Sequence, residues 1–223
     1  MDRIVFTASD GLYGTELWVS DGTATGTYLL HDTYPGPGNG SPDQLTVGDG
    51  HLYFVSNNGI NGRELWHSDL TNFGTAMLRD INTGGSSSSP QSLYWARSKL
   101  FFSATDSSSS PSAVGRELFV SDGTSRGTTI VADINPGPGG SSPQHLIAAG
   151  AGIYFAANGA ETGDIELYFS DGSSSGTYQV CEVYPGRIGS HPHSLTVSGG
   201  NLYMTATSAI TGVELHVITG FPA

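Results

Sequence analysis

A Glu-Leu-aromatic tripeptide returns at nearly constant intervals along the chain, and this periodicity restricts the fold more than any other feature. Successive copies are 48, 53, 49 and 48 residues apart. The longest interval contains the serine-rich segment DSSSSPSAVG, which is typical of a lengthened surface loop. A repeat of this length, when it holds four strands, is typical of a β-propeller blade. The five copies are Glu16-Leu17-Trp18, Glu64-Leu65-Trp66, Glu117-Leu118-Phe119, Glu166-Leu167-Tyr168 and Glu214-Leu215-His216.

Each repeat contains four short apolar or alternating segments. In residues 44–81 these are QLTV, HLYFVS, ELWHSD and TAMLRDI. A glycine-rich turn separates the first two, a polar loop of variable length (the hairpin loop) joins the second and third, and Asp-Gly-Thr-x-x-Gly-Thr joins the third and fourth. No window carries apolar residues at helical spacing, and 32 glycines and 11 prolines interrupt the chain. We therefore predict an all-β fold with almost no helix.

The connection from the fourth strand of one repeat to the first strand of the next, which we call the crossing loop, has a constant length of eleven residues. A constant length is expected where the chain crosses from the outer strand of one blade to the inner strand of the next. Its copies are residues 32–42, 80–90, 133–143 and 182–192.

The second and third strands occur five times in the sequence, but the first and fourth occur only four times. We predict a single domain over residues 1–223, a five-bladed β-propeller of four-stranded antiparallel blades. In this arrangement the first blade lacks its inner strand and the last blade lacks its outer strand. A four-bladed ring with an additional hairpin, and closure through a second chain in an oligomer, are the alternatives.

Composition excludes several classes of function. The net charge is −12, with 8 basic against 20 acidic residues, which argues against a nucleic-acid partner. The most apolar run, LIAAGAGIYFAA, is about half the length needed to span a bilayer, so we expect no membrane insertion. The apolar segment at the start is too short for a signal peptide. Cys181 is the only cysteine, so no disulfide can form within the chain.

The sequence resembles a known repeat family. ELWVSDGT (residues 16–23) matches the ELWxxDGT repeat, and ELFVSDGT (residues 117–124) differs from it in the aromatic residue alone. The resemblance implies a propeller-like repeat protein of the kind found in secreted or cell-surface proteins, and it implies no catalytic residues. The plan of about five repeats also resembles the five-bladed tachylectin-type lectins, whose blades each carry a sugar site. We therefore expect an extracellular or cell-surface location.

Two carboxylates are expected to face each other in each blade. If the third and fourth strands pair through the Asp-Gly-Thr turn, the Glu of the tripeptide lies opposite the acidic residue that ends the fourth strand. We expect these repeat carboxylates to be structural and to accept N–H groups of the crossing loop, with a calcium site as the alternative and no other metal or cofactor. The pairs are Glu16 with Asp32, Glu64 with Asp80, Glu117 with Asp133, and Glu166 with Glu182.

Hairpin loops and crossing loops are expected on the same face of the ring, where most of the variable polar residues gather. A sugar needs amides, carboxylates and backbone groups for its hydroxyls and an aromatic ring for its C–H face. The candidate carbohydrate-binding residues on this face are Tyr13, Tyr34, Arg63, Asn82, Arg116, Asn135, Asn158, Tyr184 and His191.

These residues predict a multivalent lectin for glycans or glycoproteins, with one shallow site per blade or between blades. The main alternative is a non-catalytic structural or protein-interaction scaffold. A glycosidase would require one blade to differ by gaining acidic residues, and none clearly does, so we expect no enzyme. His191-Pro192-His193 could chelate a transition metal, but we interpret it as a pair of loop residues.

Overall fold

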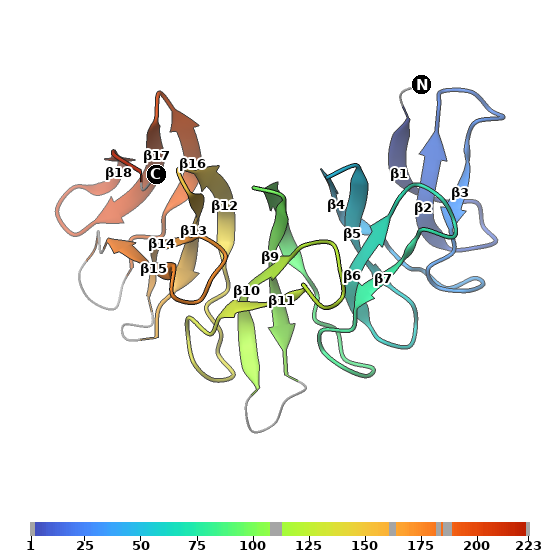
Figure 1. Ribbon diagram of the computed structural model, residues 1–223, viewed down its shortest axis with the longest axis horizontal. Coiled ribbons are helices and arrows are strands. Elements are labelled where there is room, and N and C mark those ends of the chain that lie inside the picture. The colour runs from blue at the N-terminus through green and yellow to red at the C-terminus, as the bar shows by residue number, and fades with distance from the viewer. Residues whose placement is uncertain (1–2, 108–112, 161–163, 182–183, 185–188, 222–223) are drawn as a thin grey trace.

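The computed structural model describes residues 3–107, 113–160, 164–181, 184 and 189–221. Its strands form five antiparallel sheets, which we call the first to fifth blades in chain order (Figure 1). The first blade contains β1 (Ile4–Ser9), β2 (Thr15–Ser20) and β3 (Tyr28–His31). The second contains β4 (Asp43–Gly48), β5 (His51–Asn57), β6 (Arg63–Ser68) and β7 (Ala76–Arg79), and the third contains β8 (Gln91–Ala96), β9 (Lys99–Asp106), β10 (Val114–Ser121) and β11 (Thr129–Ala132). The fourth contains β12 (Gln144–Ala149), β13 (Gly152–Asn158), β14 (Ile165–Ser170) and β15 (Thr177–Cys181), and the fifth contains β16 (His193–Ser198), β17 (Asn201–Ser208) and β18 (Gly212–Ile218).

The all-β prediction is confirmed, because the elements of the described residues are all strands. The first and fifth blades have three strands and the other three have four, so the first blade lacks its inner strand and the fifth its outer strand, as predicted. Among the described residues there is no helix long and apolar enough to cross a membrane.

The blades follow one another along an open arc, and the chain ends lie at its two opposite ends (Figure 1). The inner strands β4, β8, β12 and β16 contact each other in this order. The layout is therefore propeller-like. Closure into a ring is not observed, because no hydrophobic cluster of the described residues joins the fifth blade to the first.

The hydrophobic core lies between the blades. Four clusters of buried residues occupy the four interfaces of the arc, one between each pair of neighbouring blades. Side chains of one strand alternate between two clusters: Leu52 of β5 packs with Leu17 of the first blade, whereas Tyr53 packs with Leu100 of the third. Burial on both faces explains why these strands read as nearly continuous apolar runs.

The Asp-Gly-Thr segment, which is Asp-Leu-Thr in the second blade and Asp-Gly-Ser in the fourth, closes the hairpin between the third and fourth strands with local hydrogen bonds. The Oδ1 atom of Asp21 accepts hydrogen bonds from the N–H (3.0 Å) and the hydroxyl (2.7 Å) of Thr23. Gly22 has φ 89°, a conformation that glycine adopts without strain. Asp69, Asp122 and Asp171 make the same contacts in their blades. These aspartates therefore stabilise the turns between the third and fourth strands.

Candidate ligand-binding clefts between neighbouring blades

The glutamate of each tripeptide anchors the crossing loop that leaves its blade. Glu64 is buried, and its carboxylate accepts hydrogen bonds from the N–H of Ile81 (3.0 Å), the N–H of Ser88 (2.7 Å) and the hydroxyl of Ser88 (2.5 Å). Glu16, Glu117 and Glu166 are buried in the same way and accept N–H groups of their own crossing loops. Burial raises the pKa of Glu64 and Glu117, and the hydrogen bonds from the crossing loop oppose this rise.

The second carboxylate of the pair holds other parts of the loops in the first and second blades. Asp80 accepts hydrogen bonds from the Asn61 side chain (2.7 Å) and the N–H of Gly84 (3.2 Å), so it ties the hairpin loop to the crossing loop. Asp32 accepts the N–H of Gly36 (3.0 Å) in the first blade. Asp133 is exposed, and Glu182 lies outside the described residues.

The predicted pairing through the Asp-Gly-Thr turn is wrong by one residue next to the turn. The register that places Glu16 opposite Asp32 also places Asp21 opposite Thr27, but Val19 pairs with Tyr28, and the N–H of Asp21 donates to the carbonyl of Gly26. A bulge between Leu17 and Trp18 then shifts the register, and β6, β10 and β14 carry the same irregularity. Beyond the bulge, Leu17 pairs with His31, which is the register expected at this end of the hairpin.

The described carboxylates do not form a metal-binding site. The described residues contain no group of three or more His, Cys, Asp or Glu side chains that could hold a metal ion. The oxygens of Glu64 already accept hydrogen bonds from protein donors.

Hairpin loops and crossing loops lie on the same side of the blades, as predicted. The N–H of Thr15, at the end of one hairpin loop, donates to the Asn39 side chain of the crossing loop (2.8 Å). In the second blade the N–H of Arg63 donates to the hydroxyl of Ser87 (2.9 Å). The two kinds of loop therefore contact each other on one face of the blades.

Two clefts open at repeat-equivalent positions on this face, each between the inner strands of neighbouring blades. The arginine cleft, between the third and fourth blades, has a volume of about 350 Å³. The histidine cleft, between the fourth and fifth blades, has a volume of about 250 Å³. The arginine cleft is lined by Gln91, Ser92, Arg116, Ser142, Pro143, Gln144 and His145. The histidine cleft is lined by Gln144, His145, Ala156, Ile165, His191, Pro192 and His193.

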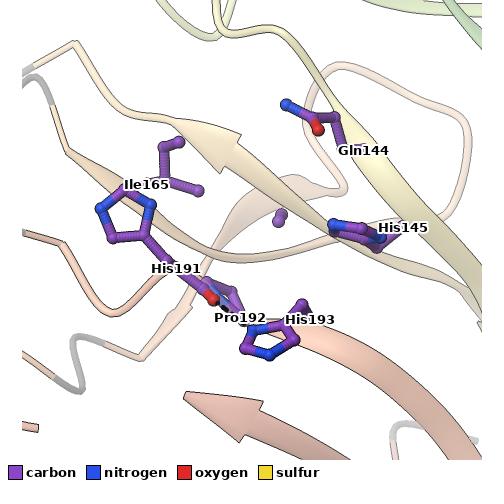
Figure 2. A pocket seen from close by; sticks show the side chains of 7 residues that line it. Gln144, His145, Ile165, His191, Pro192 and His193 are labelled. Carbon is purple, nitrogen blue, oxygen red and sulfur yellow. Dashed lines mark hydrogen bonds between the residues drawn. The ribbon is translucent and has the colours of Figure 1, made fainter. Parts of the chain in front are cut away.

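The two clefts share Gln144 and His145, which belong to the wall between them. Figure 2 shows His191 and His193 on one side of the histidine cleft and Gln144 and His145 on the other. The lining combines amides, imidazoles and serine hydroxyls, which can donate to and accept from a polar ligand.

The walls of the clefts contain backbone conformations that non-glycine residues rarely adopt. The residue before the proline of the crossing loop has φ between 44° and 49° in all four copies, and the second residue of the inner strand has φ between 54° and 57°. Such conformations cost of order 1–3 kcal/mol each and occur often at functional sites. The first set is Ser41, Ser89, Ser142 and His191, and the second set is Gln44, Ser92, His145 and Ser194.

The second set coincides with a bulge in each inner strand. In β12 the register shifts between Gln144 and Ile147, and β4, β8 and β16 shift at the equivalent place. A bulge re-aims side chains next to it. His145 lies within the bulge of β12 and lines both clefts.

Arg63 and Arg116 occupy the same position in two neighbouring blades, but their surroundings differ. Arg63 forms an ion pair with Asp43 (2.7 Å) and donates to the carbonyl of Ser41 (3.0 Å). Arg116 is half-buried and donates through Nη1 to the carbonyls of Ser89 (2.8 Å) and Ser103 (3.2 Å).

Of the nine residues predicted to bind carbohydrate, Arg116 and His191 line the clefts, and Arg63 occupies the position equivalent to Arg116. Asn82 is buried and donates to the carbonyl of Ser87 (3.1 Å), and Asn135 donates to the carbonyl of Gly140 (2.9 Å), so both amides brace crossing loops. The Tyr34 ring packs against Gly38 and Gly59 and fills the space that a side chain there would need.

The remaining candidates lie outside both clefts. Tyr13 is exposed on the first hairpin loop, whereas Asn158 and Tyr184 are half-buried. Sequence reasoning missed Gln91, Gln144 and His145, and it interpreted His193 as a loop residue. The available signal was their position in the repeat: Gln91, Gln144 and His193 directly follow the proline that ends a crossing loop, and His145 follows Gln144.

No model of a known protein family matches the chain, and no curated protein sequence matches it. Among solved structures, the chain is similar to a crystal structure of puromycin hydrolase, with a TM-score of 0.56, 15% sequence identity and coverage of 97% of this chain. The match covers 33% of puromycin hydrolase, so this chain spans about a third of its length. At this identity the likeness is one of fold alone, which agrees with the blade layout.

Proposed function

We propose that this protein is a multivalent carbohydrate-binding protein whose sites are the clefts between neighbouring blades. The observation that carries the proposal is the repetition of one polar cleft at equivalent positions of successive blades. Repeated weak sites on one rigid arc gain affinity together at a glycan-coated surface. We also propose that the blades belong to a five-bladed propeller of the ELWxxDGT repeat family that acts on extracellular glycans or glycoproteins without catalysis.

The lining of the clefts supports a sugar ligand in particular. Hydroxyl groups of a sugar need both donors and acceptors, which the amides of Gln91 and Gln144 and the hydroxyls of Ser92 and Ser142 supply. The ring of His145 offers a flat face for the C–H groups of a sugar.

Calorimetric titration with a panel of neutral and acidic saccharides tests the proposal. We expect binding with a stoichiometry above one per chain. His145→Ala should weaken binding at both clefts because His145 lines both. His51→Ala is the matched control, because His51 follows the turn between β4 and β5, at the end of the second blade away from the crossing loops.

Two results would count against carbohydrate binding. The first is absence of binding across the saccharide panel. The second is equal loss of binding in the His145→Ala and His51→Ala variants, which would show that the ligand does not bind in the clefts. Capture of a specific protein partner by a chain that binds no saccharide would favour a scaffold.

A further inference from the structure

Arg116 is a half-buried cation that lines a cavity, and none of the described carboxylates pairs with it. Its Nη1 atom donates to the carbonyls of Ser89 and Ser103, and among the described residues no hydrogen bond or ion pair involves its Nε or Nη2. Burial is what lowers the pKa of this guanidinium. A guanidinium remains protonated in proteins, so the positive charge persists inside the cleft.

The neighbouring blade shows how the same position is neutralised. Arg63 donates to the carbonyl of Ser41 as Arg116 donates to that of Ser89, and its Nη2 pairs with Asp43 at 2.7 Å. Asp43 directly follows the proline of its crossing loop, and the residue that follows the equivalent proline beside Arg116 is Gln91. The third blade therefore keeps the arginine and its carbonyl contacts but has a neutral amide in place of the counterion.

Among the described residues that line the arginine cleft, none is acidic. Its lining consists of Arg116 with glutamine, serine, proline and histidine side chains. This composition stands out in a chain with a net charge of −12. A desolvated cation without a counterion is costly, and an anion from the ligand relieves that cost.

We propose that the arginine cleft selects glycans that carry an anionic oxygen group, a carboxylate or a sulfate, and that the free edge of the Arg116 guanidinium binds this group. This inference rests on the proposed carbohydrate-binding function. The carbonyls of Ser89 and Ser103 fix the guanidinium through Nη1, so its planar edge is held in place before the ligand arrives. Gln91 and Gln144 lie in the same cleft and supply neutral contacts for sugar hydroxyls.

A glycan array with neutral, carboxylated and sulfated members tests the selection, followed by calorimetry with the best neutral and the best acidic glycan. We expect the acidic glycans to bind more tightly. Gln91→Asp should place a carboxylate against Arg116, as Asp43 does against Arg63, and weaken acidic glycans roughly tenfold or more while leaving neutral ones unchanged.

The reciprocal exchange in the second blade is the matched control. Asp43→Gln removes the counterion of Arg63 and should increase, not decrease, the affinity for acidic glycans. Both exchanges alter one solvent-accessible side chain, and thermal unfolding of each variant verifies that the fold is retained.

The outcomes of these experiments distinguish the anion site from the proposed carbohydrate binding. Equal affinity for neutral and acidic glycans, or no effect of Gln91→Asp on acidic ones, would overturn the anion site and leave carbohydrate binding intact. Titration with inorganic sulfate, followed through the NMR signal of the Arg116 Nε–H group, reports the anion site without a sugar. A sulfate-induced shift of this signal in a chain that binds no glycan would support the anion site and contradict the carbohydrate-binding function.

Discussion

One buried glutamate performs the same task in each of the first four blades. In the second blade, both oxygens of Glu64 accept hydrogen bonds from the crossing loop. Glu214 of the fifth blade, which no crossing loop follows in this chain, is exposed. The same residue type at the same repeat position is therefore buried only where a loop supplies donors for it.

Replacing Glu64 with Gln should destabilise the protein by about 1–3 kcal/mol. Each oxygen of Glu64 accepts at least one hydrogen bond, so an amide nitrogen in either position leaves a buried donor facing another donor. Chemical denaturation measures the effect, and Glu214→Gln, at an exposed site, should leave the unfolding midpoint unchanged. Equal midpoints for Glu64→Gln and the native chain would show that the carboxylate is not needed.

The pH dependence of stability follows from the same burial. The folded-state pKa of Glu64 is raised from its ordinary value of 4.5, so the folded protein holds this proton more tightly than the unfolded chain does. The stability contributed by this group is complete below pH 4.5 and is lost as the pH rises through the raised pKa. His67, whose pKa is lowered by burial, contributes the opposite slope up to about pH 6.5.

A comparison of variants distinguishes the contribution of Glu64 to the pH dependence of stability from that of His67. We expect the difference in free energy of unfolding between the native chain and Glu64→Gln to vary with pH above 4.5. As the pH rises, the native chain should lose more stability than the variant. Denaturant titrations in steps of one pH unit between pH 4 and 8 measure this difference. A constant difference across this range would contradict the raised pKa.

At the scale of the strand, the sequence predicted which segments pair but not how the backbone bends. Apolar runs, turn residues and the constant crossing length were sufficient for the blades and for the missing strands of the first and fifth blades. The bulges at Leu17/Trp18 and in the inner strands were not predictable, because a one-residue insertion leaves no mark in an apolar pattern. His145 lies within the bulge of β12 and lines both clefts, and for that reason sequence reasoning identified the face but missed this residue.

The second glycine of the Asp-Gly-Thr-x-x-Gly-Thr turn has no space beside it for a side chain. A Cβ atom at Gly127 would lie 2.0 Å from the Asp122 carboxylate, which accepts the turn's own hydrogen bonds. Gly127→Ala should therefore destabilise the protein by about 1–3 kcal/mol. Gly85→Ala is the control, because the nearest atom to its Cβ would be 3.7 Å away. Thermal unfolding that ranks the two variants equally would show that the turn rearranges freely.

At the scale of the whole molecule, the blades at the ends of the arc each leave uncovered a face that inner blades bury. Leu167 of the fourth blade is 0% exposed, whereas Leu215 at the same repeat position of the fifth blade is 72% exposed. At the other end, Ile4 is 64% exposed, whereas Leu52 at its position in the second blade is 4% exposed. Each pair of neighbouring blades packs through the same type of interface. The uncovered face of the fifth blade corresponds to one side of this interface, and the uncovered face of the first blade corresponds to the other side.

We therefore expect this chain to associate head to tail with a second copy, the fifth blade of one packing on the first blade of the other. Exposed apolar faces of this kind favour contact with a complementary surface, and head-to-tail contacts of this type can extend beyond two copies. Sedimentation velocity should show an average mass that rises with protein concentration, and Leu215→Asp should suppress this rise. Ile60→Asp, at a residue of the second hairpin loop that is 76% exposed, should not. A single monomeric species at all concentrations, or equal association of the two variants, would show that the uncovered faces do not meet.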